Sequence, residues 1–140
     1  MVLAMIISMP LMAQNFDVTD TTTEYTIKGT RYSDIFEGRR TASGEVFKQN
    51  LYTAAHNKIK LGTLVMVTNP ESNKQLIVKI NDRCPKKNLI DLTKRAAKEL
   101  KLSGCKPVKI RILPSTYQDQ WEQQKGPIDL IEDTIEINED

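Results

Sequence analysis

Three polar side chains in this sequence could carry acid–base chemistry: Glu45, His56 and Asp82. Glu45 and His56 lie in one polar stretch, residues 38–56, and His56 is the only histidine in the chain. Carboxyl groups and an imidazole can donate and accept protons during bond cleavage. Each of the three could instead have a purely structural role. Glu45 could be a solvated surface residue, His56 a packed histidine, and Asp82 a turn residue close to Pro85. The residue types therefore indicate a candidate catalytic site without specifying its reaction.

The stretch 38–56 reads GRRTASGEVFKQNLYTAAH, and its composition predicts a loop rather than a buried strand. It joins a basic pair, Arg39 and Arg40, to turn-forming residues that include Thr41 and Ser43. Gly, Ser and Thr beside charged residues are typical of loops, and loops held by a rigid scaffold often carry function. We therefore expect this loop to be held by the strands that precede and follow it.

Alternating apolar and polar residues predict the strands that position these side chains. The predicted strands are residues 24–32, 51–55, 63–69, 75–81 and 107–113. The turn at 70–73 suggests a hairpin between the third and fourth of them. Residues 91–102 are the one clear helix, with Asp91 as its N-cap and Gly104 after its last turn. About five or six short strands with one late helix favour a small closed β-barrel.

Length and charge limit the classes of protein and partner that fit this chain. Its 140 residues allow one domain with one small core. Residues 1–113 hold nineteen of the twenty basic residues and ten of the eighteen acidic ones. A basic body suits an anionic partner such as an acidic cell-surface polymer. No pattern of aromatic residues interleaved with Arg is visible, so we do not expect a nucleic-acid partner.

The two ends of the chain differ from the predicted barrel, residues 24–113. Residues 1–13 have the length and composition of a signal-peptide core, too short to span a bilayer, which predicts an exported protein. Residues 14–23 are a polar leader. Residues 114–140 are an acidic tail, in which Trp121 could stack on a sugar or pack the tail onto the barrel.

The chain has two cysteines, Cys84 and Cys105. In an oxidising compartment an even pair favours one disulfide, which would stabilise the fold by roughly 3 kcal/mol. Zinc binding by the two cysteines with His56 and Asp82 has the right number of ligands, but no CxxC or HxxxH spacing supports it. Two free thiols are the third possibility. We predict the disulfide, and no metal or other cofactor.

Five segments of the sequence together resemble a known family. They are GRRTASGEVF, LYTAAH, LGTLVMVTN, VKINDRCP and IDLTKRAAKEL, in an order and at spacings that resemble the rare-lipoprotein-A family of lytic transglycosylases. The resemblance covers about residues 29–113. It implies a six-stranded double-psi β-barrel with one inserted helix, a fold shared with expansins. It also implies cleavage of peptidoglycan glycan strands between N-acetylmuramic acid and N-acetylglucosamine, with a 1,6-anhydromuramic end as product.

The resemblance also implies roles for individual residues. The family's ASGE carboxylate matches Glu45, its TAAH histidine matches His56, and the Asp of its NDR motif matches Asp82. One carboxyl group can protonate the leaving oxygen and then accept the proton of the C6 hydroxyl, while a second stabilises the positive charge. Five further residues are expected to bind the glycan: Arg39, Arg40, Thr41, Ser43 and Arg83. The three arginines could instead pair with these carboxylates.

Two positions depart from the family pattern. Many members carry Asp three residues after the ASGE glutamate, where this chain has Lys48, and Cys84 stands where Gly is common. Lys48 and the basic body favour an alternative function, a non-catalytic, expansin-like module that binds the glycan. For either function we expect an exported monomer whose partner is the peptidoglycan glycan strand.

Overall fold

A computed structural model describes residues 23–125, which form a closed barrel of six strands. The strands are β1 (Glu24–Arg31), β2 (Thr53–Ala55), β3 (Leu64–Asn69), β4 (Lys74–Asp82), β5 (Leu89–Leu92) and β6 (Lys106–Leu113). Their order around the barrel is β1-β5-β2-β4-β3-β6. The helical segments are η1 (Asp34–Phe36), α2 (Lys94–Glu99), η2 (Ser115–Tyr117) and α3 (Gln118–Gln123).

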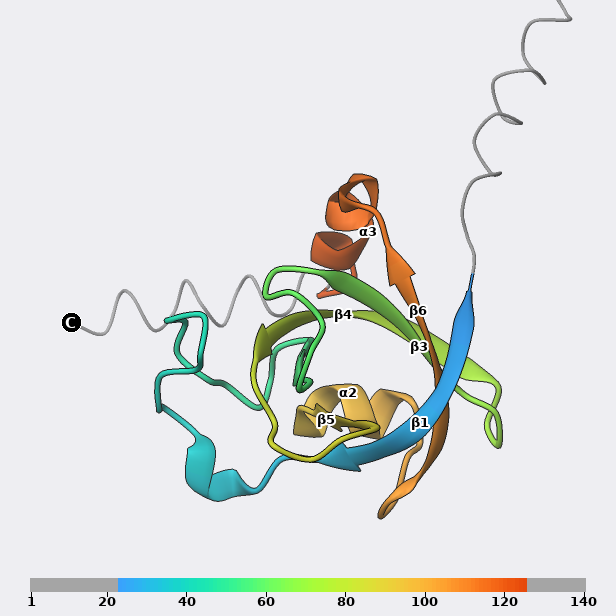
Figure 1. The fold of residues 1–140 in the computed structure, drawn as a ribbon, viewed down its shortest axis with the longest axis horizontal. Coiled ribbons are helices and arrows are strands. Elements are labelled where there is room, and N and C mark those ends of the chain that lie inside the picture. Colours follow the sequence, from blue (N-terminus) through green and yellow to red (C-terminus); the bar gives the residue numbers. More distant parts are fainter. Residues whose placement is uncertain (1–22, 126–140) are drawn as a thin grey trace, which may run out of the picture.

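The barrel mixes parallel and antiparallel strand pairs (Figure 1). β1 pairs in parallel with β5, and β2 pairs in parallel with β4, while the other four neighbours are antiparallel. The predicted six-stranded barrel, mostly strand with few helices, is confirmed. The loop between β1 and β2 extends away from the strands in this view, and it contains residues 38–52 of the polar stretch, whose last residues form β2 and His56.

Alternation of side chains along the strands builds the core. The predicted hairpin is confirmed: β3 and β4 are antiparallel neighbours paired from Leu64–Lys79 to Asn69–Lys74. Its turn places Asn73 at φ 60°, a left-handed conformation that Asn tolerates better than most residues. The main core is formed by inward-facing residues that include Val65, Val67, Val78, Ile80, Ile90, Leu92, Leu100 and Val108.

The helix begins later than the sequence pattern predicts, so the prediction of a helix over 91–102 with Asp91 as its N-cap is wrong in its bounds. Asp91 lies in β5, and Thr93 caps α2 by accepting a hydrogen bond from the amide of Ala96. The helix ends with Lys101 at φ 56°, so a lysine rather than Gly104 takes the left-handed position after the C-cap. The apolar spacing misled because Leu92 continues the helical period while belonging to a buried strand.

Residues 114–125 pack against the barrel instead of leaving it. Trp121 of α3 is buried, and its Nε1 donates a hydrogen bond to the carbonyl of Tyr52 at 2.8 Å. The side chain of Gln124 bonds both the amide and the carbonyl of Ile77, each at 2.7 Å. Trp121 therefore holds this segment on the barrel and is not available to stack on a sugar. The predicted signal peptide, the predicted leader up to residue 22, and residues 126–140 lie outside the described residues.

The predicted disulfide between Cys84 and Cys105 is not formed, because both thiols are free in the structure. Cys84 is buried in a small apolar cluster with Tyr32, Phe47, Ala55 and Leu89. Cys105 is exposed immediately before β6. The Cys84 side chain thus packs into this second cluster instead of pairing with Cys105.

Candidate functional site

The loop that carries Glu45 is a tight turn closed by its own backbone. The amide of Gly44 donates to the carbonyl of Thr41 at 2.9 Å, and the amide of Thr41 donates to the carbonyl of Glu45 at 2.8 Å. Gly44 has a φ of 93°, which glycine adopts without steric cost. The Ser43 hydroxyl donates to Oε1 of Glu45 at 3.1 Å, and the Ser43 amide donates to the carbonyl of Asn81 at 3.1 Å. The exposed Glu45 carboxylate is thus presented by a turn that is anchored on the end of β4.

Asp82, the last residue of β4, is the point at which this loop joins the barrel. Its Oδ1 accepts hydrogen bonds from the amide of Ala42 at 2.9 Å and from the amide of Arg83 at 2.8 Å. Its Oδ2 accepts the hydroxyl of Tyr32 at 2.9 Å. Three donors therefore fix the orientation of this carboxylate. The structure brings the segments of Glu45 and Asp82 together, although 37 positions separate them in the sequence.

His56 follows β2, and its backbone amide donates to the carbonyl of Asp82 at 3.2 Å. Its ring does not bond a carboxylate within residues 23–125; Nδ1 accepts from the amides of Lys58 and Ile59 at 3.0 and 3.1 Å. An accepting Nδ1 places the ring hydrogen on Nε2. Burial, then the positive charges of Arg83 and Lys58, lower the pKa of His56. The imidazole is therefore kept neutral, with Nε2 as its donor.

Arg83 holds the His56 loop rather than a carboxylate side chain. Its Nη1 donates to the carbonyls of His56 at 3.1 Å and Ile59 at 2.7 Å. The alternative raised from sequence, pairing of the guanidinium with Glu45 or Asp82, is not what this side chain does. Arg83 thus acts on the site by positioning the loop that carries the imidazole.

The other two arginines lie on the exposed loop. Arg40 donates from Nη1 to the carbonyl of Gly44 at 2.8 Å, so it braces the turn that presents Glu45. The Arg39 guanidinium lies 5.8 Å from the ring centroid of Phe36, within range of a cation–π contact. Arg39 is exposed, and a flat guanidinium on an aromatic ring is well placed to meet an anionic group of a ligand.

Two residues that the sequence did not single out for the site, Tyr32 and Asp91, complete it. Asp91 pairs with Ala55 across β5 and β2, and Ala55 pairs with Asp82 across β2 and β4. Ala55 therefore lies between the two aspartates in the sheet, at the point where the register of β2 against β4 shifts, and the Cα atoms of Asp82 and Asp91 are about 10 Å apart. Asp91 also accepts a hydrogen bond from the Thr30 hydroxyl at 3.0 Å.

The environment of Asp91 opposes its ionisation. Burial raises the pKa of Asp91, and the negative charge of Asp82 raises it further, while the Thr30 hydrogen bond and Lys86 act in the opposite direction. Burial and the Asp82 carboxylate also raise the pKa of Tyr32, which keeps its hydroxyl protonated as a donor. A half-buried carboxyl group beside a second carboxylate is a feature common at catalytic sites.

Replacing Asp91 with Asn is expected to stabilise the fold at pH 7. The folded-state pKa of Asp91 lies above the unfolded value of 3.8, so its stabilising contribution is present below pH 3.8 and is lost as the pH rises through the folded value. Asn can still accept the Thr30 hydrogen bond and carries no charge. Urea unfolding should show a gain at pH 7 that disappears below pH 3.8. Asp119→Asn, on the exposed face of α3, is the matched control, and a loss of stability at pH 7 would contradict the placement of Asp91.

Within residues 23–125, no three His, Cys, Asp or Glu side chains are grouped so that they could hold a metal ion. The zinc set considered from the sequence is therefore not assembled, since Cys105 is exposed on a different segment and the His56 Nδ1 is occupied by backbone amides. In the same residues, no helix has the length and apolar character needed to cross a membrane.

Comparison with known proteins identifies the family. The family model described as lytic transglycolase matches residues 28–112, which hold the whole site. The chain belongs to this family. The endolytic peptidoglycan transglycosylase RlpA of Pasteurella multocida is 45% identical over 83 residues, covering 58% of this chain and 28% of that protein. The protein of the same name from Rickettsia felis is 48% identical over 86 residues, covering 59% of this chain and 38% of that protein.

A solved structure supports the fold of this member of the lytic transglycolase family. The expansin of Clavibacter michiganensis superposes with a TM-score of 0.53 at 19% identity, covering 66% of this chain and 51% of that one. This likeness concerns the fold alone, and with the family match it confirms the predicted double-psi barrel. The chain spans between 28% and 38% of the length of the two curated relatives named above.

Proposed function

We propose that this chain is a lytic transglycosylase that cleaves peptidoglycan glycan strands between N-acetylmuramic acid and N-acetylglucosamine. The observation that carries the proposal is the hydrogen bond from the Ala42 amide to Asp82, which joins the Glu45 turn to the end of β4. This bond joins the segments of Glu45 and Asp82, and the His56 amide bonds the Asp82 carbonyl at the same end of β4. These segments lie within the residues that match the family. The names of the curated relatives, endolytic peptidoglycan transglycosylase, support the same substrate.

The reaction requires one proton donor that then becomes a proton acceptor. In the proposed mechanism, the Glu45 carboxylic acid protonates the glycosidic oxygen as its bond to C1 of the muramic residue breaks. The C6 hydroxyl oxygen of the same residue then bonds to C1, and its proton returns to the Glu45 carboxylate. No water is consumed, and Glu45 ends the cycle protonated as it began. The exposed position of Glu45 on a turn suits a group that must reach the substrate.

Asp82 and His56 have complementary roles in this mechanism. Asp82 is held by three donors, so its carboxylate can face the positive charge that develops at C1 without reorganising. Neutral His56 offers its Nε2 hydrogen to a sugar oxygen. Asp91, separated from Asp82 by Ala55 on the sheet, adds a third carboxyl group that retains a proton to higher pH than an ordinary Asp. These roles need no metal or other cofactor.

The polar residues of the loop fall into two groups in this proposal. Thr41, Ser43, Arg40 and Arg83 bond neighbouring loop atoms, so they position the Glu45 turn and the His56 loop. Arg39 is the arginine best placed to contact the lactyl carboxylate of the muramic residue. Such a substrate requires an exported protein, which agrees with the signal-peptide character of residues 1–13.

Digestion of purified glycan strands that lack stem peptides tests the proposal. The full chain should release fragments with 1,6-anhydro ends, each lighter by one water than the corresponding hydrolysis product. Glu45→Gln should reduce their release by about 10²- to 10⁴-fold, because the amide cannot transfer the proton. Glu71→Gln, in the turn of the β3–β4 hairpin, is the matched control and should cleave normally. Hydrolysis products from the wild-type chain would exclude the lyase reaction, and normal cleavage by Glu45→Gln would exclude this role for Glu45.

One observation favours a second function, binding of the glycan without cleavage. Lys48 is exposed and stands where many family members have an acidic residue, so the loop has one fewer carboxylate and one more cation. A glycan-binding module would retain its strand in a sedimentation assay and release no fragments. Lys48→Asp would then distinguish the two functions further. Gain of cleavage in this variant would show that the wild-type chain does not cleave because it lacks this carboxylate. Binding without cleavage in both the wild-type chain and the variant would support the module.

A further inference from the structure

A basic groove lies between the start of β4 and helix α2, away from the site at the other end of β4. It has a volume of about 610 Å³ and is lined by four cationic side chains, Lys74, Arg95, Lys98 and Lys101, and by Glu99. Asp82 is the last residue of β4 and Lys74 is the first, so a nine-residue strand separates the groove from the proposed catalytic carboxylate. The groove has an excess of positive charge that no role in glycan cleavage explains.

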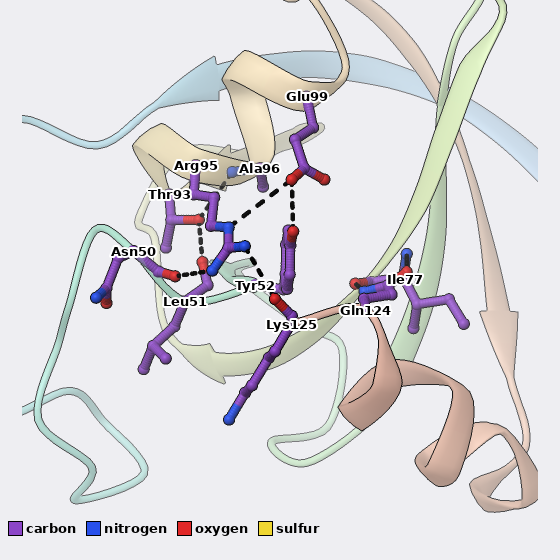
Figure 2. A network of polar contacts seen from close by, with 10 residues as sticks. All are labelled: Asn50, Leu51, Tyr52, Ile77, Thr93, Arg95, Ala96, Glu99, Gln124 and Lys125. Carbon is purple, nitrogen blue, oxygen red and sulfur yellow. Dashed lines mark hydrogen bonds and ion pairs between the residues drawn. The ribbon is translucent and has the colours of Figure 1, made fainter. Parts of the chain in front are cut away.

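Arg95 connects this groove to the end of the described chain (Figure 2). Its Nη1 donates to the carbonyl of Asn50 at 3.0 Å, and its Nη2 donates to the carbonyl of Lys125 at 3.3 Å. Its guanidinium also lies 4.5 Å from the ring centroid of Tyr52, and its Nε lies 3.7 Å from Oε1 of Glu99. The last described residue, Lys125, is therefore in contact with Arg95, a side chain that lines the groove.

The sequence that follows Lys125 has the opposite charge. Residues 126–140, GPIDLIEDTIEINED, contain six acidic residues and no Lys or Arg. An extended chain of this length reaches up to about 50 Å, whereas the six-residue helix α2 is only about 9 Å long. Every cation of the groove is thus within reach of carboxylates tethered at Lys125.

We propose that the acidic segment 126–140 binds in the basic groove of its own chain. Tethering gives the segment a millimolar effective concentration at the groove, so weak, exposed ion pairs are enough to populate the bound form. Free polyanions then compete with the segment for the same cations. The inference does not depend on the proposed catalytic function, because none of the groove residues belongs to that site.

Carbodiimide cross-linking of the full chain tests this proposal, since the reagent joins carboxylates to amines only in direct contact. At about 50 mM salt, peptide mapping should find links from Asp129, Glu132 or Asp133 to Lys74, Lys98 or Lys101, and these links should be lost at about 1 M salt. Mixing light and isotopically heavy chains separates links within one chain from links between chains. Links spread over exposed lysines such as Lys28 and Lys87, or formed only between chains, would overturn the proposal.

Charge-reversed variants give a second, independent measurement. Lys74→Glu with Lys98→Glu should remove most of the links, whereas the matched pair Lys28→Glu with Lys87→Glu should leave them unchanged. Replacing the six acidic residues of the segment by their amides should tighten binding of inorganic polyphosphate by at least about tenfold, because the tethered competitor is gone. Equal polyphosphate affinity in the two forms would mean that the segment does not occupy the groove.

Discussion

Replacing Asp82 with Asn is expected to reduce release of anhydro-ended glycan fragments by about 10²- to 10⁴-fold, with the barrel still folded. The substitution keeps the size of the side chain. The retained Oδ1 can still accept the amides of Ala42 and Arg83, and the new amide group can donate to the Tyr32 hydroxyl, which is able to act as an acceptor. What disappears is the negative charge that, in the proposed mechanism, faces the positive charge developing at C1.

Two measurements separate this loss of charge from a loss of structure. Thermal unfolding should show that Asp82→Asn remains folded at the assay temperature, and glycan-strand sedimentation should show that it still binds. Tyr32→Phe is the positioning control, because it removes one donor from Asp82 and leaves the carboxylate in place. It should lower cleavage far less than Asp82→Asn. Equal losses from the two variants would mean that orientation, not charge, is what Asp82 contributes.

Local sequence patterns predicted part of the candidate site. Strand alternation predicted β3, β4 and β6 closely. The polar loop marked Glu45, and the polar end of a strand marked Asp82. Their juxtaposition depends on the Ala42 amide and the Asn81 carbonyl, two backbone groups whose partners are set by the tertiary fold. The family resemblance supplied what spacing could not, namely the expectation that these segments form one site.

Asp91 shows why the remainder of the site was not predictable. Asp91 lies in a strand of only four residues, and the other three are buried. The strand leads directly into the capped helix α2, so the helical spacing of apolar residues continues across the boundary. The residues before Thr93, Ile-Asp-Leu, are as compatible with a helix start capped by Asp91 as they are with a strand. The choice is made by pairing with β1 and β2, which are far away in the chain. The role of Arg83 was not predictable for the same reason. The carbonyls that its guanidinium contacts lie in the His56 loop, and no residue pattern around Arg83 indicates them.

The segment after the last strand gives the largest expected effect on stability. Trp121→Ala should lower the free energy of unfolding by about 3–5 kcal/mol, the range for truncating a large buried aromatic side chain. Trp121 is 8% exposed, packs within the main core cluster, and donates from Nε1 to the Tyr52 carbonyl at 2.8 Å. Lys79 also lies 4.7 Å from the centroid of its ring. The substitution therefore removes packing, a buried hydrogen bond and a cation–π contact together.

Urea unfolding at neutral pH measures this loss, and two further variants apportion it. Trp121→Phe keeps most of the packing and removes one of the two donors to the Tyr52 carbonyl, because the Lys79 amide still donates to it at 3.1 Å. It should therefore lose only about 0.5–1.5 kcal/mol. Gln120→Ala, on the exposed face of the same helix, should change the stability by less than about 0.5 kcal/mol. A loss below about 1 kcal/mol for Trp121→Ala would mean that α3 is not part of the cooperative unit. The expected loss would instead show that the barrel needs residues beyond β6, because they supply the buried Trp121 side chain of the core cluster.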